Sequence, residues 1–522
     1  MSYAIQTNQH LITVKDERFL SIAESLRPLI FRKSTIPENV VLLREDQEAV
    51  HGWRSEVKVS AANYLQQAFS AGDSFILDFG THGVGLLGFS CESEGSPPDA
   101  PAHLKFTFGE TLAEVAEPFS EYQGWLSSSW LQEHDEYIDI FPAEINLSRR
   151  YCFRYMKVEV IALSPKYRIK FKNISFETVT SAPETCLQSH ATDPLLRRID
   201  EISVLTLRNC MQDVFEDGPK RDRRLWLGDL RLQALVNDVT FKNYDLVRRC
   251  LYLFAGQRRD DGMVSANIFV KPEVIPDDTF LFDYSLFFVD VLNQYVLQTQ
   301  DIDTARDLWP VALRQIELAL ERCDGNGLVN DSDEWWSFID WHEELNKQGP
   351  SQAIMIYCVE QAILLAQICQ PEKCEPLTRE LTRLKMAAKE LWDPVSGFYV
   401  SGAGRQISFA TQVWMVLADM GDLSHQQNIM NNLLSHPPEI GMNTPYMRHH
   451  FIAALLKTQM RERATDEIKA YWGKMVEYGA DTFWELFDPE RPDFSPYGSK
   501  LINSYCHAWS CTPAWFIRQY GL

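Results

Sequence analysis

The sequence predicts a multidomain β plus α protein: a β-sandwich over residues 1–185, then an (α/α)6 barrel, a double ring of twelve helices, over residues 190–522. Apolar residues alternate with polar ones in the first part and adopt a helical period in the second. Three similar turns recur in the helical part. A chain of 522 residues also exceeds what one hydrophobic core normally supports.

Period-two alternation, interrupted by Gly, Pro and Ser clusters, predicts the strands of the first domain. Alternate side chains of a strand lie on one face, so an alternating apolar set can face a buried interior. We also expect a helical insertion over Ser60 to Ala71. The clearest alternating runs are Phe75-Leu77-Phe79, Leu104-Phe106-Phe108, Met156-Val158-Val160 and Ile169-Phe171.

The period changes at Thr192-Asp193-Pro194, where Asp193 can cap a helix and Pro194 can occupy its first turn. Beyond this point three turns each run into a short apolar segment. The spacing between them equals two helices with their loops, which predicts repeated helical hairpins. An irregular all-helical domain is the alternative that this spacing leaves open. The turns are Asp261–Val264, Asp324–Val329 and Asp393–Val400.

Composition limits the partners of the protein. Fifty Lys and Arg residues oppose 72 Asp and Glu residues, and the net charge of -22 would repel nucleic acid and anionic membranes. Residues 1–10 lack the features of a signal peptide and no uninterrupted apolar stretch approaches a membrane span, so we expect a cytoplasmic protein. The eleven cysteines lack metal-ligand spacing, and we expect free thiols, no metal and no cofactor. A homodimer is one option for the assembly.

The segment Asp217–Asp229 carries the densest chemistry of the chain, with three carboxylates, four cations and a tryptophan in thirteen residues. Gly218-Pro219 predicts a loop. A solvated charge cluster or a basic targeting run would be simpler interpretations. The interleaved aspartates and the surrounding apolar residues weaken both.

Two further segments are candidates. Glu485 follows Phe483-Trp484 and is surrounded by apolar residues, an environment typical of functional carboxylates, although a helix-end glutamate that reaches water is the simpler interpretation. His507 can bind a ligand or satisfy a polar group in the core. Indoles alternate with carboxylates around Trp335, Trp336 and Trp341, as in a sugar site, although many tryptophans must belong to the core.

These residues resemble glycoside hydrolase family 78, the bacterial α-L-rhamnosidases. The family hallmark reads Asp-Cys/Gly-Pro-x-Arg-Glu-Arg-Leu-Gly-Trp-x-Gly-Asp, and Glu485 follows a tryptophan as the family's general base does. The resemblance implies a six-hairpin glycosidase fold and inverting removal of terminal α-L-rhamnose from small rhamnosides. The positions that match the hallmark are Asp217, Pro219, Arg221, Trp226, Gly228 and Asp229.

The resemblance also implies roles for individual residues. Asp222 would be the general acid and Glu485 the general base. Asp217 and Asp229 would hold sugar hydroxyls, and Arg221 would hold a hydroxyl or orient a carboxylate. The remaining implied contacts to the sugar come from Trp226, Trp335, Trp336, Trp341 and His507.

One departure from the family concerns the acid. Asp222 stands where the family has Glu, and the side chain is one methylene shorter. Arg221 and Arg223 flank it, and we expect both to point away because a general acid must keep its proton near neutral pH. Two alternatives follow: another (α/α)6-barrel enzyme, acting on a different deoxy sugar or a uronide or as an epimerase, or a weakened sugar-binding protein.

Overall fold

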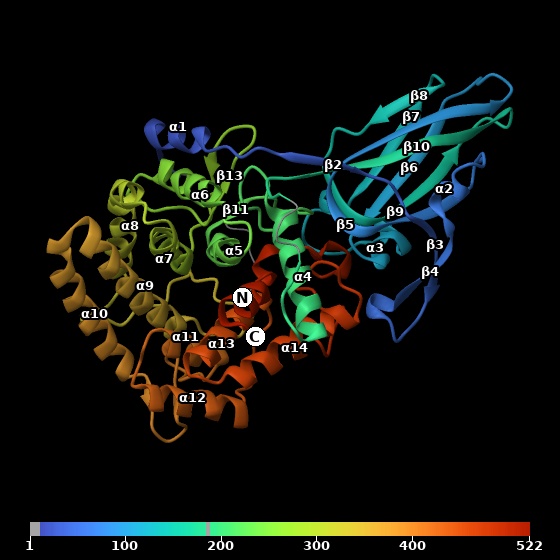
Figure 1. Ribbon diagram of the computed structural model, residues 1–522. Helices are drawn as coiled ribbons and strands as arrows, with labels where there is room; N and C mark the ends of the chain where they lie inside the picture. The colour runs from blue at the N-terminus through green and yellow to red at the C-terminus, as the bar shows by residue number, and fades with distance from the viewer. Residues whose placement is uncertain (1–10, 184–187) are drawn as a thin grey trace.

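The computed structural model describes residues 11–183 and 188–522. A sheet-rich domain stands beside a helical domain, and the two are joined along one side (Figure 1). The order of the two domains and their content confirm the predicted fold class. The predicted domain end at residue 185, the segment 1–10 in which we expected no signal peptide, and Cys186 lie outside the described residues.

The first domain is one antiparallel sheet of nine strands in the described part of the chain. Its main order is β2-β10-β5-β9-β6-β7, and β3 and β8 also pair with β5. Buried aromatic rings such as Phe106, Phe153 and Phe176 fill the interior. The strands are β2 (Phe31–Thr35), β3 (Asn39–Glu45), β4 (Trp53–Ser60), β5 (Ser74–Gly95), β6 (Ala102–Gly109), β7 (Glu133–Ile138), β8 (Ala143–Asn146), β9 (Tyr151–Ala162) and β10 (Tyr167–Thr180).

Two short helices interrupt these strands. The insertion expected over Ser60 to Ala71 is confined to one turn, α2 (Ala61–Tyr64), because Phe69 then pairs its backbone with Ile169. Helix α3 (Leu112–Ala116) begins at a capping box. Its residue Glu114 is almost fully buried where the two domains meet.

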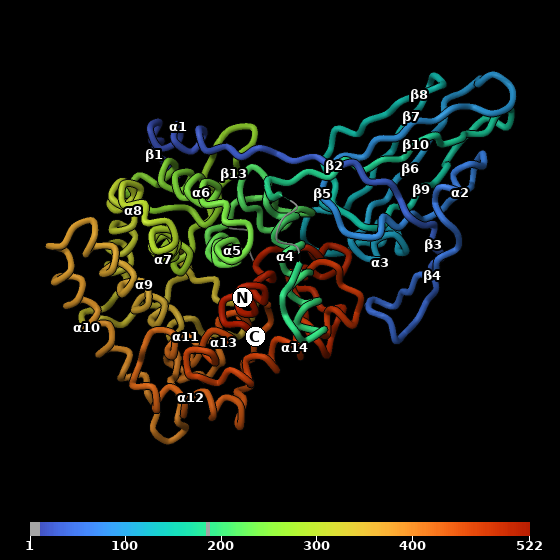
Figure 2. The backbone as a smooth tube through the Cα atoms, in the orientation of Figure 1, coloured from blue at the N-terminus to red at the C-terminus, as the bar shows by residue number. Residues whose placement is uncertain are grey.

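The helical domain is a closed double ring. Helices α5, α7, α9, α11 and α13 contact one another in sequence (Figure 2). The ring of His449 in α13 lies 5.0 Å from that of Phe516 in α15, and α15 returns to α5. The outer helices alternate with them. The bounds are α4 (Pro194–Cys210), α5 (Leu227–Val239), α6 (Tyr244–Gly256), α7 (Phe282–Thr299), α8 (Ile302–Glu321), α9 (Gln348–Cys369), α10 (Cys374–Lys389), α11 (Phe409–Leu417), α12 (Leu423–Ser435), α13 (Pro445–Lys457), α14 (Arg461–Glu477) and α15 (Pro513–Tyr520).

Local signals in the sequence correctly predicted the start of α4 and the three turns. Asp193 caps α4, and its Oδ1 accepts hydrogen bonds from the backbone N–H of Leu195 and Leu196, both at 3.0 Å. Each of the three predicted turns closes a short antiparallel pairing. Helix α9 is long and apolar enough to cross a membrane, but it is an inner helix that packs against α7, α8, α10 and α11. The ten described cysteines form no disulfide.

The start of the described chain packs on the helical domain, although the sequence grouped it with the strands. Strand β1 (Thr13–Lys15) pairs with β12 (Gln257–Arg259), and α1 (Glu17–Ser25) packs against α6. Phe19 and Ala23 of α1 are buried in the helical core. Short amphipathic segments carry no local mark of which domain will cover their apolar face.

Candidate active site

A cavity of about 310 Å³ opens among the loops at one end of the helical ring. Four loops surround it, which lie before α5, before α7, between α8 and α9, and between α14 and α15. Eight of the ten residues predicted to form the site line this one cavity. They are Asp217, Asp222, Trp226, Asp229, Trp336, Trp341, Glu485 and His507.

The loop that carries Asp217 and Asp222 is closed by hydrogen bonds at its base. The backbone N–H of Asp217 donates to the carbonyl of Arg224 at 3.0 Å, and the N–H of Arg224 donates to Asp217 Oδ1 at 3.0 Å. The N–H of Ala508 donates to the carbonyl of Asp217 at 2.8 Å. The loop is therefore tied to the segment that carries His507.

Asp222 lies at the mouth of the cavity. Its side chain is 27% exposed, whereas those of Asp217 and Glu485 are 5% and 3% exposed. Its backbone has a φ of 61°, in the left-handed region that Asp and Asn adopt with less strain than other side chains. The aspartate at this position therefore suits the backbone that it occupies.

Glu485 lies on the floor of the cavity with its carboxylate fully engaged. Arg221 Nη2 forms an ion pair with Glu485 Oε2, and the hydroxyl of Tyr497 donates to Oε1 at 2.6 Å. The backbone N–H of Ser504 approaches Oε2 at 3.4 Å. These contacts aim the carboxylate and leave it little freedom to rotate.

Arg221 is a buried positioning residue behind the cavity wall. Its Nε donates to the carbonyl of Ile502 at 3.0 Å and its guanidinium stacks 4.2 Å from the ring centre of Tyr497. Burial alone would lower the pKa of Arg221, but Glu485, Tyr497 and Asp222 raise it well above its ordinary value. Of the two roles considered for Arg221, the structure places it on a carboxylate.

The expectation that both flanking arginines point away from Asp222 is wrong for Arg221. Its Nη1 lies 3.7 Å from Asp222 Oδ1, because the same guanidinium must also reach Glu485. Arg223 does turn away: its Nε donates to the carbonyl of Lys220 and its guanidinium lies 6.0 Å from the ring centre of Trp130. The positions of these residues in the sequence did not indicate that Arg221 contacts both Asp222 and Glu485.

Asp217, Asp229 and His507 form a buried polar group on one side of the cavity. His507 Nε2 lies 3.7 Å from Asp217 Oδ2, and Nδ1 lies 3.7 Å from Asp229 Oδ1. Burial, reinforced by Arg221, lowers the pKa of His507 to about 3, so this imidazole is neutral. Neither Asp229 Oδ1 nor His507 Nδ1 has a hydrogen-bond partner among the described residues. Both atoms are available to ligand hydroxyl groups.

Aromatic rings form the rest of the cavity wall. Phe338 lies 5.3 Å from Trp341 and 5.6 Å from Trp509 between ring centres, and Trp509 packs 4.3 Å from His507. Gly228 allows Tyr284 to pack directly against the start of α5, since any Cβ there would collide with the Tyr284 ring. Flat apolar faces beside carboxylates suit a sugar ring with a methyl group.

Trp335 lies outside the cavity lining, contrary to its predicted role. Its ring centre is 5.1 Å from that of Phe282, and the guanidinium of Arg322 lies 5.9 Å from the indole. Adjacent residues in a loop point in different directions, and here Trp336 takes the cavity side. The repeated tryptophans therefore identified the correct loop. Trp336 and Trp341 line the cavity, and Trp335 does not.

Sequence reasoning also missed several residues of the lining. Tyr497 and Trp509 lie in segments close to Glu485 and His507, and their aromatic character was the available signal. Asp277 and Asp278 form a consecutive acidic pair after a proline, a pattern that predicts a polar loop. Asp277 Oδ2 accepts a hydrogen bond from Asn267 at 2.8 Å and lies 3.6 Å from Arg224.

The burial of Asp229 gives a prediction about stability. Burial raises the pKa of Asp229 well above its ordinary value, and Glu485 and Asp222 add to the rise. Because the pKa of Asp229 is higher in the folded than in the unfolded state, its carboxyl makes its full contribution to the free energy of unfolding only below the unfolded pKa of about 3.9. That contribution is lost as the pH rises through the folded pKa. At pH 7, well above that unfolded pKa, the raised pKa of the Asp229 carboxyl therefore lowers the stability of the fold.

We expect Asp229→Asn to raise the free energy of unfolding at pH 7 by about 1 kcal/mol or more, since the amide keeps nearly the same shape and does not ionise, whereas burial opposes ionisation of the carboxyl. The difference from the wild type should shrink as the pH falls toward about 4, where the wild-type carboxyl is neutral. Thermal denaturation of both proteins at several pH values measures this. A variant less stable than the wild type at pH 7 would contradict the charge argument.

The closed ring of paired helices, with carboxylates and tryptophans around one cavity, defines a carbohydrate-active enzyme of the (α/α)6-barrel class. Residues 37–178 match the model of the glycosyl hydrolase family 78 alpha-rhamnosidase N-terminal domain, and residues 188–520 match that of the bacterial alpha-L-rhamnosidase 6 hairpin glycosidase domain. The chain belongs to glycosyl hydrolase family 78.

Solved structures agree with this assignment. A rhamnosidase from Klebsiella oxytoca with rhamnose bound is 62% identical, with a TM-score of 0.97 over 98% of this chain and 100% of that chain. The family 78 rhamnosidase of Bacillus sp. GL1 is 23% identical, with a TM-score of 0.74 over 90% of this chain and 50% of that one, and it shares the fold. A comparison with curated proteins gives no match.

Proposed function

We propose that this glycoside hydrolase removes terminal α-L-rhamnose from small rhamnosides with inversion, with Asp222 as general acid and Glu485 as general base. The observation that carries the proposal is the placement of these two carboxylates in one cavity, Asp222 at its mouth and Glu485 on its floor. The 62% identity to a rhamnosidase with rhamnose bound supports the choice of sugar.

The surroundings of each carboxylate support its role. An acid at the mouth can reach the departing glycosidic oxygen, which faces the aglycone outside. A base on the floor, aimed by Arg221 and Tyr497, can take a proton from a water molecule below the sugar ring. Arg221 contacts both carboxylates with different nitrogens, so Asp222 and Glu485 lie around one guanidinium, which supports their assignment as a pair.

The first test is the substrate itself. We expect cleavage of an aryl α-L-rhamnoside and no comparable cleavage of aryl glycosides of other deoxy sugars, of common hexoses or of unsaturated uronides. Initial rates on a matched panel with one aryl leaving group measure this. Faster cleavage of another sugar would favour a different (α/α)6-barrel activity, and rhamnose binding without turnover would favour a sugar-binding protein.

The second test is the stereochemistry. Single displacement by water predicts that the first product is β-rhamnose, because attack occurs on the face opposite the aglycone. Proton NMR during the first minutes of cleavage distinguishes the two anomers before mutarotation. An initial α-anomer would exclude the inverting assignment and leave the substrate assignment intact. Cytoplasmic location, a homodimer and the lack of nucleic-acid or membrane partners stay predictions.

A further inference from the structure

The floor of the cavity is supported by one chain segment, residues 500–505, that lies against the N-terminal domain. The backbone N–H of Glu485 donates to the carbonyl of Ser504 at 3.0 Å, and the carbonyl of Ile502 accepts from Arg221. The position of this segment therefore determines where the carboxylate of Glu485 and its arginine lie.

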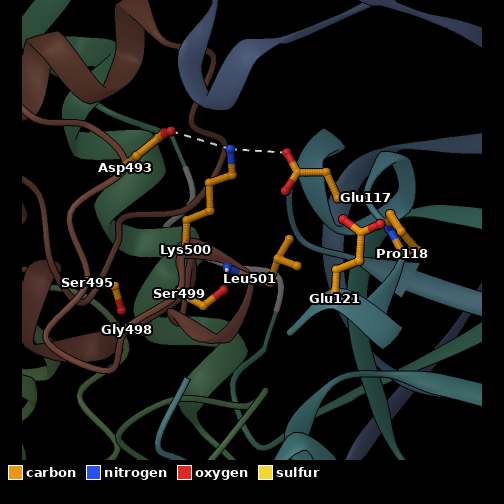
Figure 3. Close-up of a pocket in the computed structure, with 9 residues that line it drawn as sticks. All are labelled: Glu117, Pro118, Glu121, Asp493, Ser495, Gly498, Ser499, Lys500 and Leu501. Atoms are coloured by element: carbon orange, nitrogen blue, oxygen red, sulfur yellow. Dashed lines mark hydrogen bonds and ion pairs between the residues drawn. The ribbon is translucent and has the colours of Figure 1, made fainter. Parts of the chain in front are cut away.

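Three glutamates of the N-terminal domain, Glu110, Glu114 and Glu117, contact this segment or its neighbours. Glu110 Oε2 accepts from the backbone N–H of Tyr505 at 2.7 Å. Glu117 Oε1 lies 3.0 Å from Lys500 Nζ, which also approaches Asp493 at 3.3 Å. Figure 3 shows both contacts of Lys500 at a pocket of about 420 Å³ between the two domains, with the contact to Glu117 joining them.

Glu114 makes the contact that reaches furthest into the site. Its Oε1 lies 2.6 Å from Lys220 Nζ, and both side chains are buried, at 1% and 0% exposure. The Lys220 ammonium also donates to the carbonyls of Leu501 and Asn503, each at 2.8 Å. Burial, with a contribution from Glu110, raises the pKa of the Glu114 carboxyl above its ordinary value, and the Lys220 ammonium opposes this rise.

Lys220 lies two residues before Asp222, in the loop that carries the acid. Its ammonium thus joins the loop of Asp222 to the segment that supports Glu485. A buried ammonium held by two carbonyls needs a counter-charge, and in the described structure the carboxylate at 2.6 Å is that of Glu114. The second oxygen of the same carboxylate is also held in place. Glu114 Oε2 accepts hydrogen bonds from the backbone N–H of Glu110 at 2.8 Å and of Thr111 at 2.9 Å.

We propose that Glu114 of the N-terminal domain is a positioning residue for the reaction, which acts through Lys220 to set the placement of Asp222 relative to Glu485. The N-terminal domain would then be part of the catalytic apparatus rather than an independent sugar-binding module. This inference rests on the proposed function, since it assumes that these two carboxylates are the acid and the base. A misplacement of about 1 Å at the reacting groups can cost roughly a hundredfold in rate.

The test compares Glu114→Gln with the double variant Glu114→Gln/Lys220→Met. We expect Glu114→Gln to lower kcat on an aryl α-L-rhamnoside by about 10- to 100-fold, with a change of less than about threefold in the dissociation constant of rhamnose. The double variant leaves no unpaired buried charge, so it should fold and recover Tm toward the wild type. Its kcat should stay low because the ammonium link is missing.

Asp200→Asn is the matched control for lost stability. Asp200 is fully buried and accepts from Arg518 Nε at 2.9 Å and 3.1 Å, between α4 and α15 and outside the cavity lining. This variant should lower Tm and leave kcat unchanged. A kcat for Glu114→Gln within about threefold of the wild type, or a double variant that recovers kcat together with Tm, would overturn the inference. An inactive wild type would overturn the proposed function as well.

Discussion

Glu485→Gln is expected to lower kcat on an aryl α-L-rhamnoside by about 10² to 10⁴-fold, the range that general acid-base catalysis contributes. The amide keeps the shape of the side chain, and its oxygen can still accept from Arg221 or Tyr497, but it cannot take a proton from water. Because Glu485 lies on the floor of the cavity rather than across its mouth, the affinity for rhamnose should change little. Steady-state kinetics and equilibrium binding of rhamnose separate the two effects.

Glu490→Gln provides the control for this substitution. Glu490 is exposed, lies five residues further along the chain and is absent from the cavity lining, so its kinetics should match the wild type. A loss of less than about tenfold in Glu485→Gln would remove Glu485 from the role of base. In that case Asp229, a buried carboxylate that lines the cavity and has an oxygen without a hydrogen-bond partner among the described residues, would be the next candidate to test.

Asp222→Asn is expected to produce a loss that depends on the leaving group. Protonation of the departing oxygen matters most for alkyl or weakly acidic aglycones, so kcat/KM should fall by about 10² to 10⁴-fold there and much less for an activated phenol. Asn also tolerates the left-handed backbone at this position, so the loop should keep its conformation. A series of aryl rhamnosides with increasing phenol pKa measures the dependence.

Asp260→Asn is a suitable comparison, because Asp260 is an exposed carboxylate outside the cavity lining. The dependence of its kcat/KM on the leaving group should equal that of the wild type. Undiminished turnover of a poor substrate by Asp222→Asn would exclude Asp222 as the acid. A uniform loss across all leaving groups would indicate instead that Asp222 contributes to binding.

Much of the fold was predictable because its signals are local. The alternation in residues 75–79 and 104–108 reports which side chains a strand can bury, and the Asp193-Pro194 pair marks a helix start through its own backbone. The three turns set the hairpin spacing. The hallmark segment 217–229 likewise identified a loop that lines the cavity, since its residues lie within a few positions of one another.

Contacts between distant parts of the chain were beyond this reasoning. Arg221 and Glu485 are 264 positions apart, and their pairing depends on how the first and last helical hairpins meet when the ring closes. The choice between Trp335 and Trp336 as the cavity residue depends on which side of their loop faces α7. Such choices are made by packing and desolvation of the assembled side chains rather than by the residues themselves.

The sequence by itself therefore determined the two-domain class, the helical repeat and the loops that carry the chemistry, because periodicity, capping and motif spacing are properties of neighbouring residues. Three contacts could be seen only in the folded chain. Helix α1 packs on the helical domain, Arg221 contacts both Asp222 and Glu485, and Glu114 contacts Lys220. Each of these joins residues that are remote in sequence, and each exists because burial forces a charged or apolar group to find a partner across the fold.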